Sequence, residues 1–311
     1  MAEKIVITGA TGLLGANFIY TALQEGWSPV GVAWPCRLPA APVPMFELDL
    51  RKVSDAADFL AQQRPAWLVH LAAMTNVDWC EEHAVETRQL NAEVSGALAA
   101  AAAQVGAGFV YMSTDSVFDG CRGGYGEDDE PNPLNVYAAS KLEGEHLVLQ
   151  ANPAALVVRS NIFGWNAQPK ANLAEWLVKN LRAGKTIPGF TDVIFAPLLV
   201  TTLADWILNL MRAGARGRWH VASRSPISKY DFARAVALAF DLPESMIQPV
   251  KAASVAQRAH RPLNTWLKAD SAAQKLGREL PDLTTMLRDF RAQEDSGYAQ
   301  RLRATLGGVA I

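Results

Sequence analysis

The chain has 311 residues, of which 50% are hydrophobic and 19% charged, with a formal net charge of −2 at pH 7. This length allows one large core, or one core and a smaller lobe. No long run of like charges is present, so neither a nucleic-acid partner nor a membrane partner is expected. The cysteines (Cys36, Cys80 and Cys121) form no CxxC pair, and the histidines show no metal-ligand spacing. We expect no metal, no signal peptide and a cytoplasmic location.

The first 165 residues alternate strands and helices. Strands are predicted at residues 5–8, 29–34, 46–48, 67–72, 109–113 and 155–159, and helices at 13–24, 53–63, 82–104 and 135–150. Several strands are apolar at every position, which is typical of a parallel sheet with helices on both faces. The order predicts an α/β fold with a doubly wound parallel sheet of the Rossmann type.

The pattern changes after residue 164. Helices are predicted at 172–183, 201–212, 230–240 and 282–292, and a strand at 219–222. These elements predict a smaller mixed α/β lobe, about 166–195 and 224–311, that binds substrate. Residues 1–165, with about 196–223, then form the dinucleotide-binding domain.

Residues 8–15 read TGATGLLG and place Gly9, Gly12 and Gly15 between an apolar strand and an amphipathic helix. Glycines at such a turn permit close approach of a pyrophosphate to the N–H groups at the helix N-terminus. A plain tight turn is the alternative. The strand–turn–helix context favours dinucleotide binding.

The second predicted strand ends in AWPCR, with no carboxylate between Ala33 and Arg37. An acidic residue there normally binds the ribose 2′-hydroxyl of NAD. Arg37 is instead suited to a 2′-phosphate, so the sequence favours NADP, with NAD as the alternative. An ordinary surface-loop role for Arg37 remains open.

Residues 135–145 read NVYAASKLEGE, which places Tyr137 and Lys141 on one face of a helix. A lysine ammonium beside a phenol lowers the pKa of the phenol and makes it a general acid or base near neutral pH. An ordinary helix-face pair is the alternative.

The strand predicted at 109–113 ends in Ser113, Thr114 and Asp115, at the sheet edge that faces the ligand. We expect Thr114 to hydrogen bond a substrate carbonyl together with Tyr137, and Ser113 to cap the end of the strand.

At these motifs the chain resembles extended short-chain dehydrogenases/reductases and, more narrowly, the dTDP-4-dehydrorhamnose reductase family. The similarity covers nearly the whole chain and includes TGATGLLG, HLAAMTNVDWCE (70–81), RQLNAE (88–93), STDSVFDG (113–120), NVYAASKLEGE and RPLNTWL (261–267). The first and fifth motifs occur throughout the superfamily. The STD segment and the late RPLN are more specific to 4-ketosugar reductases.

The resemblance implies a catalytic triad of Thr114, Tyr137 and Lys141. Tyr137 would protonate the C4 oxygen as the nicotinamide delivers hydride, Thr114 would polarise the carbonyl, and Lys141 would bind the nicotinamide ribose. Asn91 would support the site from behind, with a helix-surface amide as the alternative. The implied cofactor contacts are Gly9, Thr11, Gly12, Leu13, Leu14, Gly15, Asp49, Leu50, Leu71, Ala72 and Ala73, besides Tyr137 and Lys141.

The resemblance places Thr75, Val77 and Thr114 at the sugar. The loop after Arg159 reads SNIFGW and departs from the family's aromatic pattern. Phe163 and Trp165 are the candidates for a stacking surface there, with core packing as the alternative for each, and Asn161 is a further substrate-binding candidate. Arg261, within RPLN, is expected to bind a substrate diphosphate, with a structural ion pair as the alternative.

The implied function is NAD(P)H-dependent reduction of a nucleotide-linked 4-keto-6-deoxysugar, with a homodimer as one expectation. One alternative is an epimerase or dehydratase of the same fold, although the acidic pair typical of dehydratases is absent, since Ser116 follows Asp115. Another is an NADP-binding regulatory subunit without turnover, like the β subunit of methionine adenosyltransferase. A reductase of a non-sugar carbonyl is the third.

Overall fold

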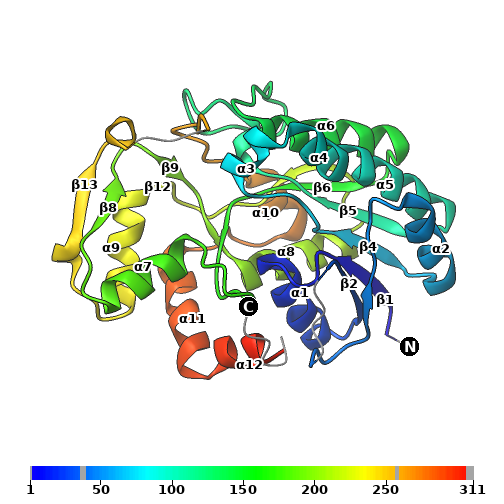
Figure 1. Ribbon diagram of the computed structural model, residues 1–311, viewed down its shortest axis with the longest axis horizontal. Coiled ribbons are helices and arrows are strands. Elements are labelled where there is room, and N and C mark those ends of the chain that lie inside the picture. The colour runs from blue at the N-terminus through cyan, green and yellow to red at the C-terminus, as the bar shows by residue number, and fades with distance from the viewer. Residues whose placement is uncertain (1, 36–39, 256–258, 306–311) are drawn as a thin grey trace.

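A computed structural model describes residues 2–35, 40–255 and 259–305. Seven parallel strands form one sheet in the order β11-β6-β5-β4-β1-β2-β3 (Figure 1). The strands are β1 Lys4–Thr8, β2 Ser28–Ala33, β3 Met45–Glu47, β4 Trp67–His70, β5 Gly108–Met112, β6 Leu156–Arg159 and β11 Gly217–His220. Their carboxyl ends therefore meet at one edge, and the strand order reverses beside β1, where such sheets bind ligands.

Helices cover both faces of this sheet, as the apolar strands predicted (Figure 1). Ile5 and Ile7 face the core that contains α1 Leu13–Gln24 and α8 Val200–Arg212. Val6 faces the opposite core, which contains α2 Val53–Gln63 and α5 Val94–Gln104. α6 Val136–Ala151 packs beside α5. The predicted doubly wound α/β fold is confirmed.

The prediction of one uninterrupted helix at residues 82–104 is wrong in its bounds and its continuity. The structure has α3 Val77–Glu82, α4 Ala84–Arg88, a π-helical turn Gln89–Glu93 and then α5. A π turn inserts an extra residue into the helix, and such turns are frequent at functional sites.

A smaller group of elements lies at the left of Figure 1. β8 Ile187–Phe190 pairs in parallel with β13 Ile247–Val250, and α7 Leu173–Arg182 and α9 Lys229–Ala239 pack beside them. The other short pairs are β7 Ile162–Phe163 with β10 Leu198–Leu199, and β9 Ile194–Phe195 with β12 Ile227–Ser228. The 3-10 turns are Asp115–Val117, Glu244–Met246 and Ala252–Ser254.

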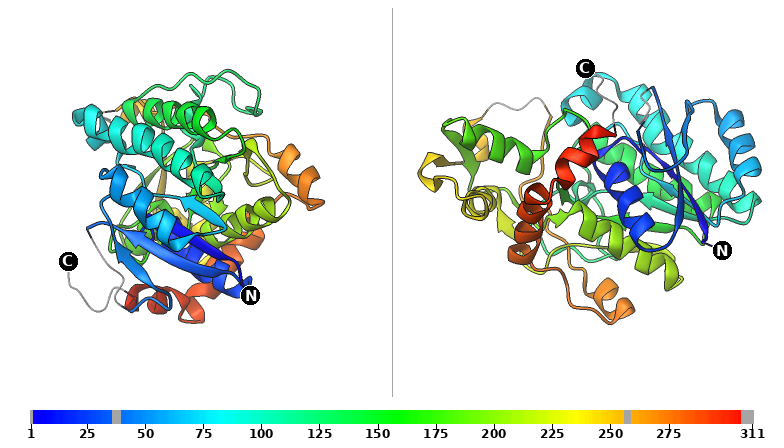
Figure 2. Two further views of the ribbon diagram at one scale, coloured as in Figure 1. Left: turned by 90° about the vertical axis from the view of Figure 1, so that its right-hand side faces the viewer. Right: turned by 90° about the horizontal axis from the view of Figure 1, so that it is seen from below.

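The C-terminal helices are α10 Asp270–Leu276, α11 Leu283–Asp295 and α12 Tyr298–Ala304. α10 packs on α8 and β11, and α12 lies beside α1, where Tyr298 donates a hydrogen bond to Asn17 (Figure 2). The division of the chain into two lobes at about residues 165, 196 and 223 stays a prediction. Within the described ranges, no helix is long and apolar enough to cross a membrane.

Candidate active site

The glycine turn after β1 has no room for a side chain at two positions. Gly9 has a φ of +64°, in the left-handed region, and a Cβ there would lie 2.7 Å from the backbone nitrogen of Ala72. A Cβ on Gly15 would overlap the carbonyl oxygen of Gly9. Gly12 is the N-cap of α1, so no side chain covers the N–H groups of the first helical turn. The turn fits the pyrophosphate of a dinucleotide.

Thr8 and His70, at the ends of β1 and β4, fix the segment beside this turn. Thr8 Oγ1 accepts the N–H groups of Leu71 at 3.2 Å and Ala72 at 3.4 Å, and lies 2.7 Å from His70 Nδ1. His70 Nε2 lies 3.0 Å from Ser95 Oγ. Burial lowers the pKa of His70 to about 3, so the ring is neutral near pH 7. His70 is therefore structural.

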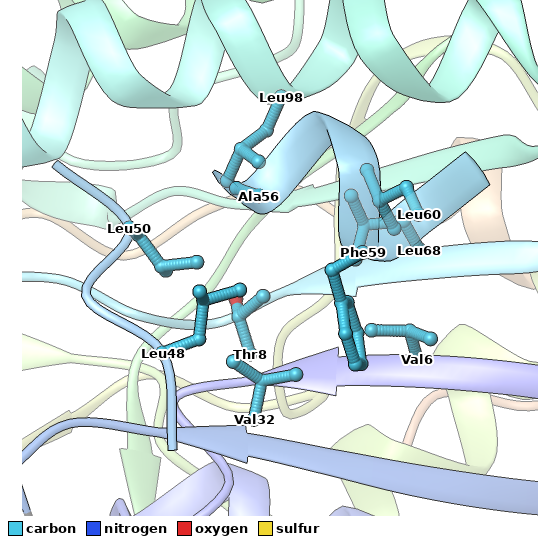
Figure 3. Close-up of a pocket in the computed structure, with 10 residues that line it drawn as sticks. All are labelled: Val6, Thr8, Val32, Leu48, Leu50, Ala56, Phe59, Leu60, Leu68 and Leu98. Atoms are coloured by element: carbon cyan, nitrogen blue, oxygen red, sulfur yellow. The ribbon is translucent and has the colours of Figure 1, made fainter. Parts of the chain in front are cut away.

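Asp49 and Leu50, the expected adenine contacts, follow β3. Asp49 accepts hydrogen bonds from the Arg51 guanidinium at 2.8 and 2.7 Å, and these bonds lower the pKa of its carboxyl group. Leu50 is buried and lines an apolar cavity of about 10 Å³ between the sheet and α2 and α5 (Figure 3). That volume suits about one water molecule, so the cavity is a packing gap. Arg37 lies outside the described residues.

Thr114 and Tyr137 come from segments that meet at the carboxyl edge of the sheet, close enough for the Thr114 hydroxyl to oppose the rise that burial causes in the pKa of the Tyr137 phenol. Thr114 follows β5 and is buried, and its hydroxyl donates to Asp115 at 3.2 Å. Tyr137 lies in the first turn of α6 and is half-buried. Desolvation raises the pKa of Tyr137 to about 12, so the phenol keeps its proton near neutral pH.

Lys141 lies one turn further along α6 and is buried, with Nζ 4.0 Å from the centre of the Tyr111 ring. Burial lowers the pKa of Lys141 to about 7, and the charge of Glu145 opposes this shift. We expected Lys141 to lower the pKa of Tyr137, and that direction is wrong here. The loss of solvent around Tyr137 dominates its pKa.

Three hydrogen bonds fix the start of α6 and thereby Tyr137. The Asn135 side chain caps the helix and donates to the carbonyl of His260 at 2.9 Å. Glu81 accepts the N–H group of Val136 at 2.8 Å. Both α3 and the segment near RPLN therefore hold the catalytic helix in place.

Asn91 lies in the π turn and is fully buried. Its Oδ1 accepts from the Met74 N–H at 2.8 Å, and its Nδ2 donates to the Met74 carbonyl and to Ser140 Oγ, each at 3.0 Å. Tyr111 donates to the Asn91 carbonyl at 2.7 Å. Asn91 therefore supports the site from behind, as expected, and is not a helix-surface amide.

The segment after Met74 carries two expected substrate residues. Thr75 is exposed, and Val77 is half-buried as the first residue of α3. The next residue, Asp78, forms an ion pair with Arg261 at 2.9 Å. Arg261 is partly exposed and lines an open cavity, where a substrate-binding residue is expected to lie. It also forms the structural ion pair that was the alternative.

Asp115 is a site residue that the sequence reasoning missed. It is buried, and its carboxylate accepts hydrogen bonds from Thr265 at 2.6 Å, from Asn161 at 3.1 Å and from Thr114. Burial raises the pKa of Asp115, and these hydrogen bonds oppose the shift. Asn161 thus reaches the site through Asp115. Thr265 lies within RPLNTWL, which was the available signal.

Trp165 lies in the core, so its predicted role in substrate binding is wrong. The side chain is 3% exposed, and its Nε1 donates to the carbonyl of Phe290 at 2.9 Å. Its ring stacks on that of Phe290 with 4.4 Å between centroids. Helix α11 therefore covers the aromatic face that a sugar would need.

Ser113 contacts a buried ion pair beneath the site. Arg159 and Glu145 are 2.7 Å apart and essentially inaccessible to solvent. Ser113 donates to Glu145 at 2.5 Å, so its side chain contacts α6 instead of capping the end of its strand as expected. In the part of the chain that the structure describes, no cluster of His, Cys, Asp and Glu suits a metal ion.

The family model described as "RmlD substrate binding domain" matches residues 3–295. The probable low-salt glycan biosynthesis reductase Agl14 of Haloferax volcanii is 32% identical over 281 residues, 89% of this chain and 93% of the relative. The dTDP-4-dehydrorhamnose reductase of Mycobacterium tuberculosis is 34% identical over 273 residues, 84% and 83% of the two chains.

The methionine adenosyltransferase 2 subunit beta of Bos taurus is 32% identical over 283 residues, 85% of this chain and 80% of the relative. Among solved structures, dTDP-4-dehydrorhamnose reductase from Bacillus anthracis in complex with NADP matches with a TM-score of 0.84 and 26% identity. That match covers 94% of this chain and 100% of the other. The family resemblance read from the motifs is confirmed.

Proposed function

Because this chain belongs to the family described as RmlD substrate binding domain, we propose that it is an NAD(P)H-dependent reductase of a nucleotide-linked 4-keto-6-deoxysugar. One observation carries the proposal. Thr114 and Tyr137 lie together at the carboxyl edge of the sheet, with Lys141 one turn further along α6, at the same edge where the glycine turn presents backbone donors. Reductases at 32% and 34% identity support this function.

Tyr137 is the general acid. Its pKa of about 12 keeps the phenol protonated, so it delivers a proton to the C4 oxygen as negative charge develops there. Thr114 holds the carbonyl oxygen beside Tyr137 through its hydroxyl. A bound nicotinamide supplies the hydride. Lys141, buried on α6 beside the Tyr111 ring, would hydrogen bond the nicotinamide ribose and hold it in place.

The cofactor is NADPH, with NADH as the alternative. Support comes from the relative solved with NADP and from the lack of a carboxylate between Ala33 and Arg37. No side chain covers the N–H groups of the first turn of α1, where a pyrophosphate would bind. The residues proposed to hold the cofactor are Gly9, Thr11, Gly12, Leu13, Leu14, Gly15, Arg37, Asp49, Leu50, Leu71, Ala72, Ala73, Tyr137 and Lys141.

NADPH oxidation with a panel of dTDP-, GDP- and UDP-linked 4-keto-6-deoxysugars tests the function. Turnover of one substrate supports the reductase and names the nucleotide and sugar. Tight NADPH binding without any turnover contradicts it and favours a non-catalytic role, as the similarity to a methionine adenosyltransferase β subunit suggests.

A homodimer and a cytoplasmic location belong to the same proposal. Light scattering on the purified protein gives the mass in solution, and fractionation of the producing cell gives the location. A monomer, or protein recovered outside the cytoplasm, contradicts the respective part.

A further inference from the structure

Helix α12 lies between α11 and α1 (Figure 1). Its residues Ala299 and Leu302 are buried in the same core as the apolar face of α1, so the helix is an integral part of the fold. The matched family model ends at residue 295, so α12 lies beyond it. The family resemblance therefore assigns no role to this helix.

The contact between α12 and α1 centres on Asn17, whose side chain is completely buried. Its Nδ2 donates to the carbonyl of Leu13 at 2.7 Å and to that of Trp165 at 2.8 Å. Its Oδ1 accepts from the Tyr298 hydroxyl at 2.8 Å, and in the part of the chain that the structure describes this oxygen has no other partner. Burial raises the pKa of Tyr298, so its hydroxyl keeps the proton that it donates near neutral pH.

Asn17 connects Tyr298 to the first turn of α1. Leu13 is the first residue of that helix, and its N–H group is among those that have no partner within the helix and can bind a pyrophosphate. Without the Tyr298 hydroxyl, the buried Oδ1 of Asn17 would lack a donor, and a buried polar atom without a partner is unfavourable. We expect the amide to shift in response and its bond to the Leu13 carbonyl to weaken.

The other end of α12 contacts the segment that follows β2. The Thr305 carbonyl accepts the N–H group of Ala40 at 3.1 Å, three residues after Arg37, the proposed contact of the 2′-phosphate. Arg303 pairs at 2.9 Å with Glu175 of α7, whose side chain is buried. The helix thus contacts both segments that are proposed to hold the cofactor and ties them to α7.

We propose that α12 positions the two cofactor-binding segments, and that Tyr298 is a positioning residue that acts through Asn17 on the backbone donors of α1 without touching the cofactor. The inference rests on the proposed function, because it concerns the NADPH of that reaction. Coupling between two sites is reciprocal, so a helix that strengthens NADPH binding is itself held more firmly when the cofactor is bound.

Calorimetric titration of the full chain with NADPH compares Tyr298→Phe with the wild type. We expect the variant to bind NADPH about three- to tenfold more weakly, as the loss of one hydrogen bond predicts. In steady-state kinetics the KM for NADPH should rise, while kcat at saturating NADPH and the KM for the sugar change by less than about twofold.

Tyr20→Phe is the matched control. The Tyr20 ring packs edge-on against the Tyr298 ring, with 5.8 Å between centroids. Within the described ranges the Tyr20 hydroxyl has no hydrogen bond, so this change removes a neighbouring hydroxyl and leaves Asn17 satisfied. Tyr20→Phe should therefore bind NADPH like the wild type.

Hydrogen exchange of the wild type tests the reciprocal effect and needs no variant. With saturating NADP, the backbone N–H groups of α12 should exchange at least about threefold more slowly. Those of α10, which packs on α8 and β11, serve as the reference and should change less. If Tyr298→Phe does not fold, this measurement decides alone.

Two results overturn the inference: Tyr298→Phe binds NADPH as tightly as Tyr20→Phe, or NADP leaves the exchange of α12 unchanged. A residue that only stabilises the fold gives the first result, with a lower melting temperature and full NADPH affinity in the folded protein. Weaker NADPH binding by Tyr298→Phe without turnover of any sugar removes the proposed function and keeps the inference. Turnover by the wild type with unchanged NADPH affinity in Tyr298→Phe removes the inference and keeps the function.

Discussion

The two sides of the candidate active site differ in how firmly the fold holds their polar side chains. On the sheet side, Thr114, Lys141 and Asn91 are buried, and neighbouring groups fix their positions. On the cavity side, Arg261 is partly exposed, and in the described ranges Lys229 has no side-chain partner. The groups on the sheet side are therefore preorganised by the fold. The cations on the cavity side have few or no protein partners, and a bound anionic ligand would supply the missing ones.

The largest expected effect comes from removing the proton-donating hydroxyl on the sheet side of the site. Tyr137→Phe removes the proton donor and keeps the ring, so kcat should fall by about 10² to 10⁴ while NADPH affinity changes only about two- to threefold. Steady-state kinetics and a fluorescence titration with NADPH measure the two quantities. Tyr20→Phe removes a hydroxyl in α1 and serves as the control. Near-normal kcat in Tyr137→Phe contradicts the mechanism.

Gly15→Ala should separate the cofactor turn from the catalytic groups. The new Cβ overlaps the Gly9 carbonyl, so α1 must move away from β1. We expect NADPH affinity to fall by about tenfold or more and stability by about 1–3 kcal/mol. Gly126→Ala, where a Cβ meets nothing closer than 3.8 Å, is the control. Unchanged NADPH affinity in Gly15→Ala would sink the assignment of this turn.

Asn91→Ala sharpens the comparison, because Asn91 acts through other residues and touches no reacting atom. Its loss leaves the Met74 backbone groups without their partner and removes one hydrogen bond to Ser140 on the catalytic helix. We expect kcat to fall by about tenfold with little change in the KM for NADPH. Kinetics normalised to folded protein measure this effect. A purely structural residue would lower the melting temperature and leave kcat per folded molecule intact.

The smallest effect concerns the neutral histidines of the sheet side. Burial lowers the pKa of His70 to about 3 and of His220 to about 4, below the ordinary 6.5. The unfolded chain binds more protons below pH 6.5, so stability decreases as the pH falls. We expect a loss of about 1 kcal/mol between pH 7 and pH 6, measured by urea unfolding. Equal stability at both values contradicts neutral, buried histidines.

Local patterns predicted the fold and the catalytic groups, because spacing in sequence determines which side chains share a helix face or a turn. Gly9, Tyr137 and Lys141 belong to such patterns. Long-range contacts escaped prediction. Thr265 hydrogen bonds to Asp115, which lies 150 residues away in the sequence. The aromatic character of Trp165 does not indicate that α11 covers its ring. The pairing of β8 with β13 joins two short segments that both contain proline, which weakens any strand signal.

Transfer of deuterium from NADPH in which both hydrogens at the nicotinamide C4 are deuterium tests the central claim most directly. Once the substrate panel has supplied a turned-over sugar, mass spectrometry of the product should show one deuterium at the sugar C4 for each NADPH oxidised. An enzyme that recycles its cofactor would give product without net NADPH oxidation. That result, or NADPH oxidation without deuterium in the sugar, would contradict the reductase.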